Sequence, residues 1–146
     1  MEADAYPDSS FLVSLHRNDQ HHSLAQSFLA RAAQSLVFNP LHRLEVRNAL
    51  RNAAANGEMT SRDCRLAFHQ IEEDLRDGLL IHTAIPWTDV FQRADELSAA
   101  HAAREGQRTI DLLHVAIALE CGATVFLSFD KRQRRVAQNA GLKVRP

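Results

Sequence analysis

The sequence lacks the marks of several protein classes. It has only two cysteines in 146 residues, Cys64 and Cys121, and their spacing matches neither a disulfide framework nor a zinc site. No apolar run approaches the roughly 20 residues of a membrane span, and the first residues show no basic stretch followed by an apolar one. We therefore expect a cytoplasmic protein with no membrane segment, in which both cysteines are buried small apolar residues.

The chain also lacks an excess of charge of either sign. Its 17 basic and 18 acidic side chains give a formal net charge of −1. A nucleic-acid site must therefore come from a local group of basic side chains, and not from the overall charge. No internal repeat, low-complexity stretch or linker is visible, and the length is close to the commonest domain size. One domain over residues 1–146 is expected.

Short apolar runs alternate with longer helical patterns along the chain. Strands are expected at 6–8, 36–38, 79–84, 124–129 and 142–144. Helices are expected at 11–15, 21–34, 40–55, 60–77, 88–104, 109–120 and 130–140. This alternation predicts an α/β fold in which helical layers cover a parallel sheet.

Several local signals refine these boundaries. Asn39 is a strong helix cap, with proline at the first helical position after it. Ser9 or Ser10 is expected to cap the helix at 11–15. Pro7 is awkward in a strand, because proline has no N–H to donate to a neighbour. Trp87 and Phe91 are expected to anchor the core or the start of a helix.

Four acidic residues stand beside apolar residues and outside solvated charge runs. They are Asp8, Glu45, Asp111 and Asp130. Asp8 and Asp130 each follow a predicted strand, and ligands of open α/β sheets bind beyond the carboxyl ends of the strands. Carboxylates that converge there repel one another, and a divalent cation makes the arrangement tolerable. The pattern indicates metal-assisted phosphoryl chemistry.

Each acid also has a purely structural interpretation. Asp130 with Gln133 three residues later fits a capping box. Asp111 suits the dipole of a first helical turn, and Asp8 suits a turn that starts a helix. Glu45 is harder to explain in this way, because it lies on an apolar helical stripe and needs a partner. These alternatives stay open, although one metal site accounts for all four acids more economically.

The residues around these acids resemble the PIN-domain family, specifically the VapC-type ribonuclease toxins of bacterial toxin–antitoxin pairs. The resemblance covers nearly the whole chain, and its most specific part lies in the C-terminal third. It rests on residues 6–13, Leu44-Glu45-Val46, residues 109–118, residues 126–137 and Gly141-Leu142. The departures are Pro7 before the first acid and Ser128 where the family more often has threonine, and neither removes an acid.

This resemblance implies a three-layer α/β/α sandwich around a central parallel sheet. It also implies Mg²⁺- or Mn²⁺-dependent cleavage of single-stranded or loop RNA at the four acids. Ser10 then takes the small polar position that supports the first acid. As partners the resemblance implies a small antitoxin and a second copy of the chain in a homodimer. The apolar helices at 24–32 and 49–68 suit a helix-in-groove partner.

The expected roles divide the acids into two pairs. Asp8 and Asp111 are expected to bind the metal directly, and Glu45 and Asp130 to bind a second ion or metal-bound waters. His114 lies three residues after Asp111 and is expected to pack beside the site without touching substrate. The alternative is that it orients the Asp111 carboxylate or touches substrate.

Basic residues flank two of the acids in the sequence. We expect this group to bind RNA phosphates, although a solvated helix face is an equally good explanation for any one member. The group comprises Arg104, Arg108, Lys131, Arg132, Arg134 and Arg135.

Two other functions remain open. The first is a PIN-fold module that binds RNA or protein without cleaving, against which four intact acids argue. The second is a phosphatase with an aspartate nucleophile at a strand end. That chemistry usually needs a second aspartate two residues after the first, and Ser10 occupies that position.

Overall fold

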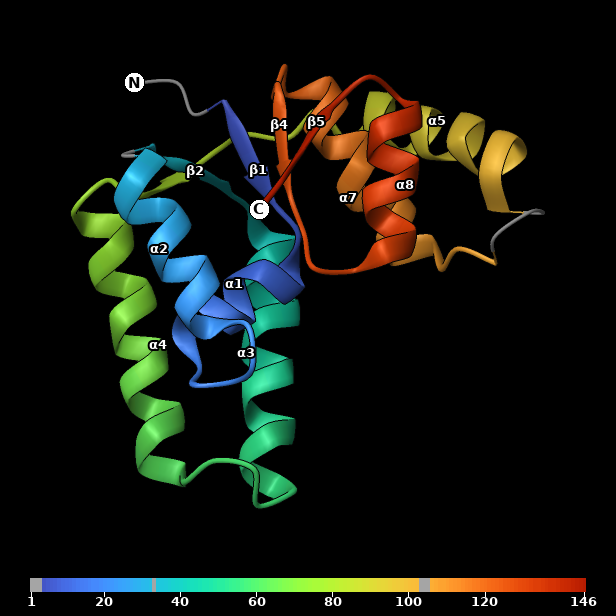
Figure 1. The fold of residues 1–146 in the computed structure, drawn as a ribbon. Helices are drawn as coiled ribbons and strands as arrows, with labels where there is room; N and C mark the ends of the chain where they lie inside the picture. The colour runs from blue at the N-terminus through green and yellow to red at the C-terminus, as the bar shows by residue number, and fades with distance from the viewer. Residues whose placement is uncertain (1–3, 33, 103–105) are drawn as a thin grey trace.

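A parallel sheet lies at the centre of the molecule (Figure 1). The computed structural model describes residues 4–32, 34–102 and 106–146. Within them the strand order is β3-β2-β1-β4-β5, and every neighbouring pair is parallel. The strands are β1 Ala5–Pro7, β2 Leu36–Phe38, β3 Leu80–His82, β4 Val125–Leu127 and β5 Lys143–Arg145. The predicted parallel sheet is confirmed.

Helices cover both faces of this sheet. One layer contains α1 Ser9–His16, α2 His22–Ala32, α3 Pro40–Ala55 and α4 Ser61–Arg76. The other contains α5 Trp87–Leu97, continued by the π-helix η1 Ser98–Ala102, then α7 Thr109–Glu120 and α8 Lys131–Asn139. The expected α/β/α sandwich is therefore confirmed (Figure 1).

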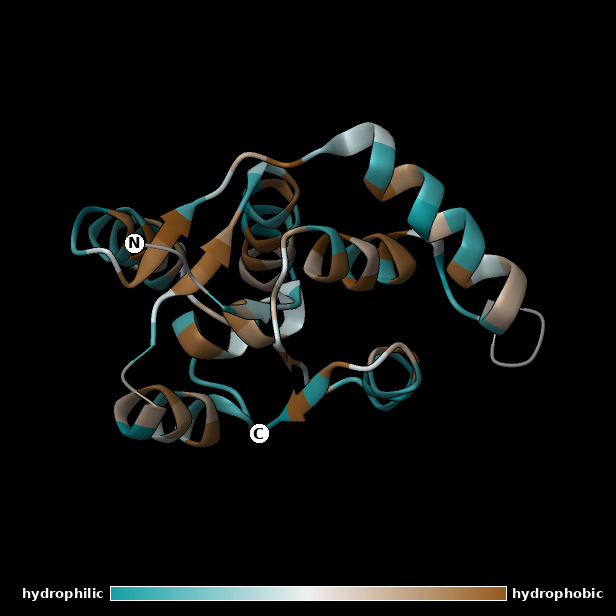
Figure 2. Ribbon diagram, turned by 90° about the horizontal axis from the view of Figure 1, so that it is seen from above, coloured by the Kyte–Doolittle hydropathy of each residue, from teal (hydrophilic) through white to brown (hydrophobic). Residues whose placement is uncertain are grey.

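Alternate strand residues point into two separate cores, as the pleat requires. Tyr6 and Phe126 pack in the core beneath α5, α7 and α8. Their neighbours Ala5 and Leu127 pack in the core beneath α1 to α4. Helix α7 is buried from Asp111 to Ala118 and is brown on almost every side in Figure 2. Because α7 is buried all round, its polar residues have fixed positions in the fold.

The strand order reverses between β1 and β4. The chain runs outward from β1 through β2 to β3, then crosses back to place β4 on the other side of β1. At the carboxyl ends of these two strands the Asp8 N–H donates to the Leu127 carbonyl at 2.9 Å. Open α/β sheets bind their ligands at such a reversal, and Asp8 and Ser128 are the first residues beyond these two strand ends.

The predicted difficulty at Pro7 is solved locally. Pro7 ends β1 opposite Leu127 of β4, and on its other side β1 pairs with β2 only through Ala5 and Leu36. The lack of an N–H on Pro7 therefore removes no hydrogen bond to β2. The Pro7 carbonyl accepts a hydrogen bond from Nε2 of His42 at 2.7 Å, where a neighbouring strand would otherwise supply a backbone N–H.

Some local predictions are wrong. The cap of α1 is Asp8, whose carboxylate accepts from the Phe11 N–H, and not Ser9 or Ser10. Trp87 is the first residue of α5, as one of its two expected roles required, but it is 38% exposed and Phe91 is 56% exposed, so neither belongs to the core. Both lie on the outer side of α5, where the helical pattern alone does not show which face meets the sheet.

Of the two cysteines that were expected to be buried, only one is buried. Cys64 is buried and Cys121 is half-buried, and neither is in a disulfide. None of the helices in the described residues is both long and apolar enough to cross a membrane. The predicted end of the helix at 88–104 lies outside the described residues.

Candidate active site at the reversal of strand order

Asp8 is the most enclosed of the four predicted acids. It is fully buried, and it accepts hydrogen bonds from Ser10 Oγ at 2.7 Å, the Phe11 N–H at 2.8 Å and Ser128 Oγ at 2.5 Å. All three donors are neutral. Burial raises the pKa of Asp8, and the hydrogen bonds and the charge of His114 offset this only in part. The fold therefore holds a carboxylate that is unfavourable to ionise without a nearby positive charge.

Glu45 projects from α3 and has a charged neighbour. Ser9 Oγ donates to its Oε1 at 2.7 Å, and Nε2 of His114 makes a short hydrogen bond to the same oxygen. Burial pushes the pKa of Glu45 up, but the hydrogen bond and charge of His114, followed by Ser9 and Arg108, outweigh it. The pKa is lowered as a result, and Glu45 is ionised at neutral pH.

His114 is almost fully buried in α7 and bridges two layers of the fold. Its Nδ1 lies 2.7 Å from the hydroxyl of Tyr6, which also accepts a hydrogen bond from Asn39 Nδ2 at 3.3 Å. The two ring nitrogens of His114 are thus held between the Tyr6 hydroxyl and the Glu45 carboxylate. His114 thus orients Glu45, whereas the sequence suggested Asp111 as its nearest acid.

Asp111 lies in the first turn of α7 and is buried. It accepts hydrogen bonds from Arg108 Nε at 3.1 Å and Nη2 at 3.3 Å, and from Gln133 Nε2 at 3.2 Å. The other side-chain atom of Gln133, Oε1, is buried without a hydrogen-bond partner. An unused acceptor therefore lies on the side chain that bonds to Asp111.

Asp130 is the N-cap of α8, as its structural interpretation predicted. Its carboxylate accepts from the N–H groups of Arg132 at 2.9 Å and Gln133 at 3.0 Å, and its own N–H donates to Ser128 Oγ at 3.0 Å. The reciprocal half of the predicted capping box is not formed, because the Gln133 side chain bonds to Asp111 instead.

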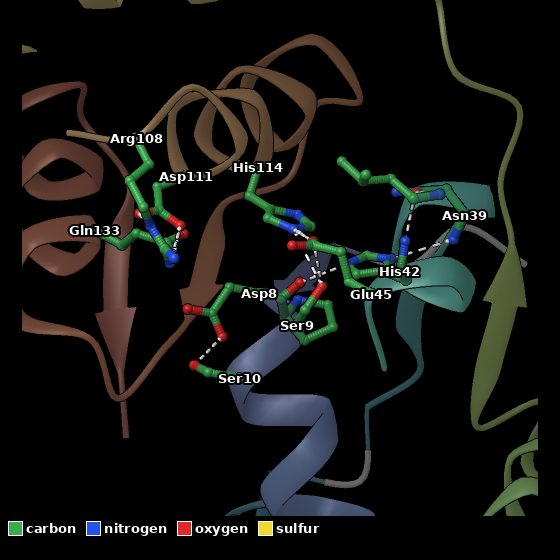
Figure 3. A network of polar contacts seen from close by, with 12 residues as sticks. Asp8, Ser9, Ser10, Asn39, His42, Glu45, Arg108, Asp111, His114 and Gln133 are labelled. Atoms are coloured by element: carbon green, nitrogen blue, oxygen red, sulfur yellow. Dashed lines mark hydrogen bonds and ion pairs between the residues drawn. The ribbon is translucent and has the colours of Figure 1, made fainter. Parts of the chain in front are cut away.

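These contacts join the four acids into one network. Ser128 links Asp8 to Asp130, and Gln133 links Asp130 to Asp111. Ser9, the neighbour of Asp8 in the chain, contacts Glu45 and lies 3.1 Å from His114. Figure 3 shows Asp8 between two groups, one around Asp111 and the other around Glu45. The structure thus brings together acids that are up to 122 positions apart, counting from Asp8 to Asp130.

A single guanidinium interacts with three of the acids. The pKa of Arg108 is raised by its hydrogen bond to Asp111 and by the charges of Asp111, Asp130 and Glu45. Its side chain is largely exposed, whereas that of Asp111 is buried. A cationic group therefore already lies at the point where the acids converge.

The predicted RNA-binding residues fall into three groups. Arg108 is paired with Asp111, and Arg134 Nη1 donates to the Ser128 carbonyl at 2.7 Å, which holds the loop after β4. Arg104 lies outside the described residues. The other three predicted residues, Lys131, Arg132 and Arg135, are exposed on α8.

The donor set suits a hard divalent cation such as Mg²⁺. It consists of oxygen ligands, the buried charge of Asp8 faces only neutral donors, and Gln133 Oε1 is an orphaned acceptor beside Asp111. In the part of the chain that the structure describes, no three carboxylate, imidazole or thiol side chains are placed so that they could hold an ion together. The chemistry of the residues fits the ion, and binding would require Asp111 to exchange its Arg108 partner.

Two contributors to the network were missed at the sequence level. Tyr6 and Asn39 are fully buried polar residues that fix His114, and the sequence marked one only as part of a strand and the other only as a cap. A signal existed for Tyr6, the only tyrosine, because it lies two residues before Asp8 in a buried strand.

Solved structures from three organisms share this fold. VapC20 of Mycobacterium tuberculosis, a sarcin–ricin loop cleaving toxin, is 19% identical with a TM-score of 0.68, covering 97% of this chain and 99% of its own. PAE2754 of Pyrobaculum aerophilum is 17% identical with a TM-score of 0.58, covering 99% and 90%. FitAcB of Neisseria gonorrhoeae is 12% identical with a TM-score of 0.65, covering 97% and 96%. At these identities the likeness shows the fold alone.

The family follows from the sequence match. No curated protein matches the chain closely enough to count as a relative. The family model for the PIN domain, however, matches residues 5–139, which include β1 to β4 and all four acids. The chain therefore belongs to the PIN-domain family.

Proposed function

We propose that this protein is a metal-dependent endoribonuclease, the toxin of a toxin–antitoxin pair. The observation that carries the proposal is the convergence of the four acids where the strand order reverses: hydrogen bonds join Asp8, Asp111 and Asp130, and Ser9, next to Asp8 in the chain, bonds to Glu45. Membership of the PIN-domain family and the shared fold with a toxin that cleaves the sarcin–ricin loop support it.

In this proposal Asp8 and Asp111 hold Mg²⁺ or Mn²⁺, with Asp130 and Glu45 beside them. When bound, the cation stabilises charge on the phosphate oxygens and lowers the pKa of a coordinated water. A positive ion also relieves the unfavourable ionisation of the buried Asp8. Asp8 is a poor candidate for a covalent nucleophile, because it is fully buried and its oxygens accept three hydrogen bonds.

Glu45 is the proposed acceptor of the proton from the attacking water. Its lowered pKa keeps it ionised, and His114 Nε2 and Ser9 Oγ hold Oε1 in a fixed orientation. In-line attack by water leaves a 5′-phosphate and a 3′-hydroxyl on the RNA. The exposed cations of α8, Lys131 and Arg132 among them, bind neighbouring phosphates.

An antitoxin and a second copy of the chain are the proposed protein partners. Large apolar side chains are exposed on three helices of one layer: Leu24 of α2 is 46% exposed, Leu44 of α3 66% and Leu66 of α4 54%. Partner proteins commonly cover apolar surface of this kind.

The proposal is tested by incubating the purified protein with a mixed RNA pool in EDTA, Mg²⁺ or Mn²⁺. Cleavage is expected only with metal, with 5′-phosphate ends, and is expected to be lost in Asp111→Asn. Sequencing of the ends locates the cuts. Cleavage that persists equally in EDTA and in the variant would exclude the proposed site.

The ion pair of Arg108 gives a separate prediction for metal affinity. Arg108→Ala removes a cation that competes for Asp111, so Mn²⁺ is expected to bind a few-fold more tightly, up to about fivefold for an exposed pair worth no more than about 1 kcal/mol. Calorimetric titration measures this, and Arg93→Ala is the matched control because Arg93 pairs with Glu120 away from the acids. Weaker Mn²⁺ binding in Arg108→Ala would show that the guanidinium does not compete with metal.

RNA binding without cleavage is the second candidate function. Two contacts favour it: Arg108 pairs with Asp111, and His114 pairs with Glu45. Both acids are therefore already bound to basic side chains, whereas a nuclease needs them for metal. RNA binding that is unchanged by EDTA, with no cleavage of any substrate in Mg²⁺ or Mn²⁺, would establish this candidate in place of the first.

A further inference from the structure

A cavity of about 380 Å³ opens directly beside the acid network. Its walls come from α1, from the loop that leads to α2 and from α3, and they include Ser9, Ser10, Val13, His21, Glu45 and Ala49. The volume is near the lower end of the range for small-ligand sites, about 300–1,000 Å³. The cavity therefore has room for a single ring system with its sugar, and little more.

One wall of the cavity is the end of an aromatic column. The buried ring of Phe11 stacks on Phe129 with centroids 5.6 Å apart, and Phe129 stacks on His21 at 4.3 Å with the planes only 7° apart. Phe129 covers one face of the imidazole, and among the described residues no other ring stacks on His21. The column therefore ends in a flat ring at the cavity, which is the arrangement on which single-stranded bases stack.

The position of His21 is fixed before any ligand binds. The carboxylate of Asp19 accepts from the His21 N–H at 2.9 Å and from Ser14 Oγ at 2.9 Å. These bonds tie the loop after α1 to the helix itself. A platform held in place in this way loses little conformational entropy when a ring stacks on it.

The charge of the cavity selects the kind of group it can hold. Its lining includes the carboxylates of Asp19 and Glu45 and no lysine or arginine. An anionic phosphate is disfavoured there, whereas the amino and imino N–H groups of a base can donate to carboxylates. Val13 and Ala49 add apolar surface for the faces of a ring.

We infer that this cavity binds one nucleobase of a single-stranded RNA, stacked on His21, next to the phosphodiester bond that is cut. Ser9 and Glu45 belong both to the cavity and to the acid network, so a base held here leaves its phosphate at the acids. The inference rests on the proposed ribonuclease function and adds a site that selects the nucleotide beside the cut.

The test measures kcat/KM for wild-type protein, His21→Ala, His21→Phe and His69→Ala on short single-stranded RNAs in Mg²⁺. His69 is an exposed histidine of α4 paired with Glu73, and serves as the matched control. Loss of a stacked base predicts a decrease of about 5- to 150-fold in His21→Ala. His21→Phe and His69→Ala should stay close to wild type, and His21→Ala should also lose nucleotide preference beside the cut.

A second measurement needs no protein variant. Wild-type protein in EDTA is titrated into labelled RNAs that carry one abasic nucleotide at successive positions, and anisotropy reports binding. An abasic nucleotide is expected to weaken binding at one position only, the position beside the cut, and by about 5- to 150-fold. If cleavage is robust but insensitive to His21 and to every abasic position, the base site is excluded and the nuclease stands. If base-dependent binding occurs without any cleavage, the nuclease is excluded and the base site stands. No binding in either buffer overturns both.

Discussion

Replacing Asp8 by asparagine is expected to abolish RNA cleavage and, in metal-free buffer, to make the protein more stable. Cleavage should fall by at least about 10²–10³-fold, the size of effect seen when one charge-stabilising group is removed from an active site. Stability should rise because the Oδ1 of asparagine still accepts from Ser10 and Phe11, its amide N–H can donate to the Ser128 hydroxyl, and no charge is buried. An increase of about 1 kcal/mol would raise Tm by roughly 2–4 °C in a domain of this size.

The pH dependence of this stability difference follows from the raised pKa of Asp8. A group whose pKa is raised by folding contributes stability below its unfolded pKa, and that contribution is lost as the pH rises through the folded value. Wild-type protein in EDTA is therefore penalised at neutral pH. The Tm difference between Asp8→Asn and wild type should shrink as the pH falls toward 3.8, the ordinary pKa of the group.

Added metal is expected to reverse the order of stability. Mn²⁺ at 100 times its Kd stabilises the species that binds it by about 2.7 kcal/mol, and Asp8→Asn should gain far less. Thermal unfolding in EDTA and with increasing Mn²⁺ measures both effects. Ser10→Ala is a useful control, since it removes one hydrogen bond to Asp8 and keeps the charge. A variant that is less stable than wild type in EDTA would show that the carboxylate is needed for folding and not for metal.

The sequence predicted the elements of this fold better than it predicted the contacts of the site. Local chemistry decides where many elements begin: Asn39 caps α3 with Pro40 after it, and the run at Leu36–Phe38 forms β2 with the expected limits. In the segment Asp8-Ser9-Ser10, by contrast, three residues can each cap a helix. Asp8 takes the role because the strand ahead of it ends at Pro7 and leaves Asp8 in extended backbone conformation.

Contacts of long side chains in the site depend on tertiary structure, which the sequence does not reveal. Gln133 lies three residues after Asp130 and satisfied a capping-box pattern, yet its amide reaches Asp111 on another helix. His114 lies one helical turn after Asp111, and orienting that carboxylate was one alternative to its expected supporting role. The burial of α7 instead turns His114 toward Tyr6 of β1 and Glu45 of α3. The capping-box interpretation thus named the wrong partner for the Gln133 side chain, and so did the alternative in which His114 orients Asp111.

His114 is expected to be the residue whose truncation most affects stability and cleavage together. His114→Ala removes the partner of a half-buried carboxylate and leaves the Tyr6 hydroxyl without its histidine partner. Breaking a fully buried pair on one side typically destabilises by about 3–5 kcal/mol, and the cost here should be at or below the lower end because solvent reaches Glu45. Cleavage should fall by a further 10- to 100-fold, the range for groups that orient ligands of a metal site.

Two variants separate these effects at a temperature where all the proteins remain folded. Tyr6→Phe removes only the hydroxyl, so it should lose about 1 kcal/mol of stability and keep most of its cleavage, because His114 still contacts Glu45. His114→Gln restores an N–H donor toward Glu45 and should recover part of kcat with KM unchanged. If His114→Ala cleaves as fast as wild type per folded molecule, His114 only packs the core. A loss of kcat that His114→Gln relieves, with RNA binding unaltered throughout, would instead identify His114 as the residue that orients Glu45 for proton transfer.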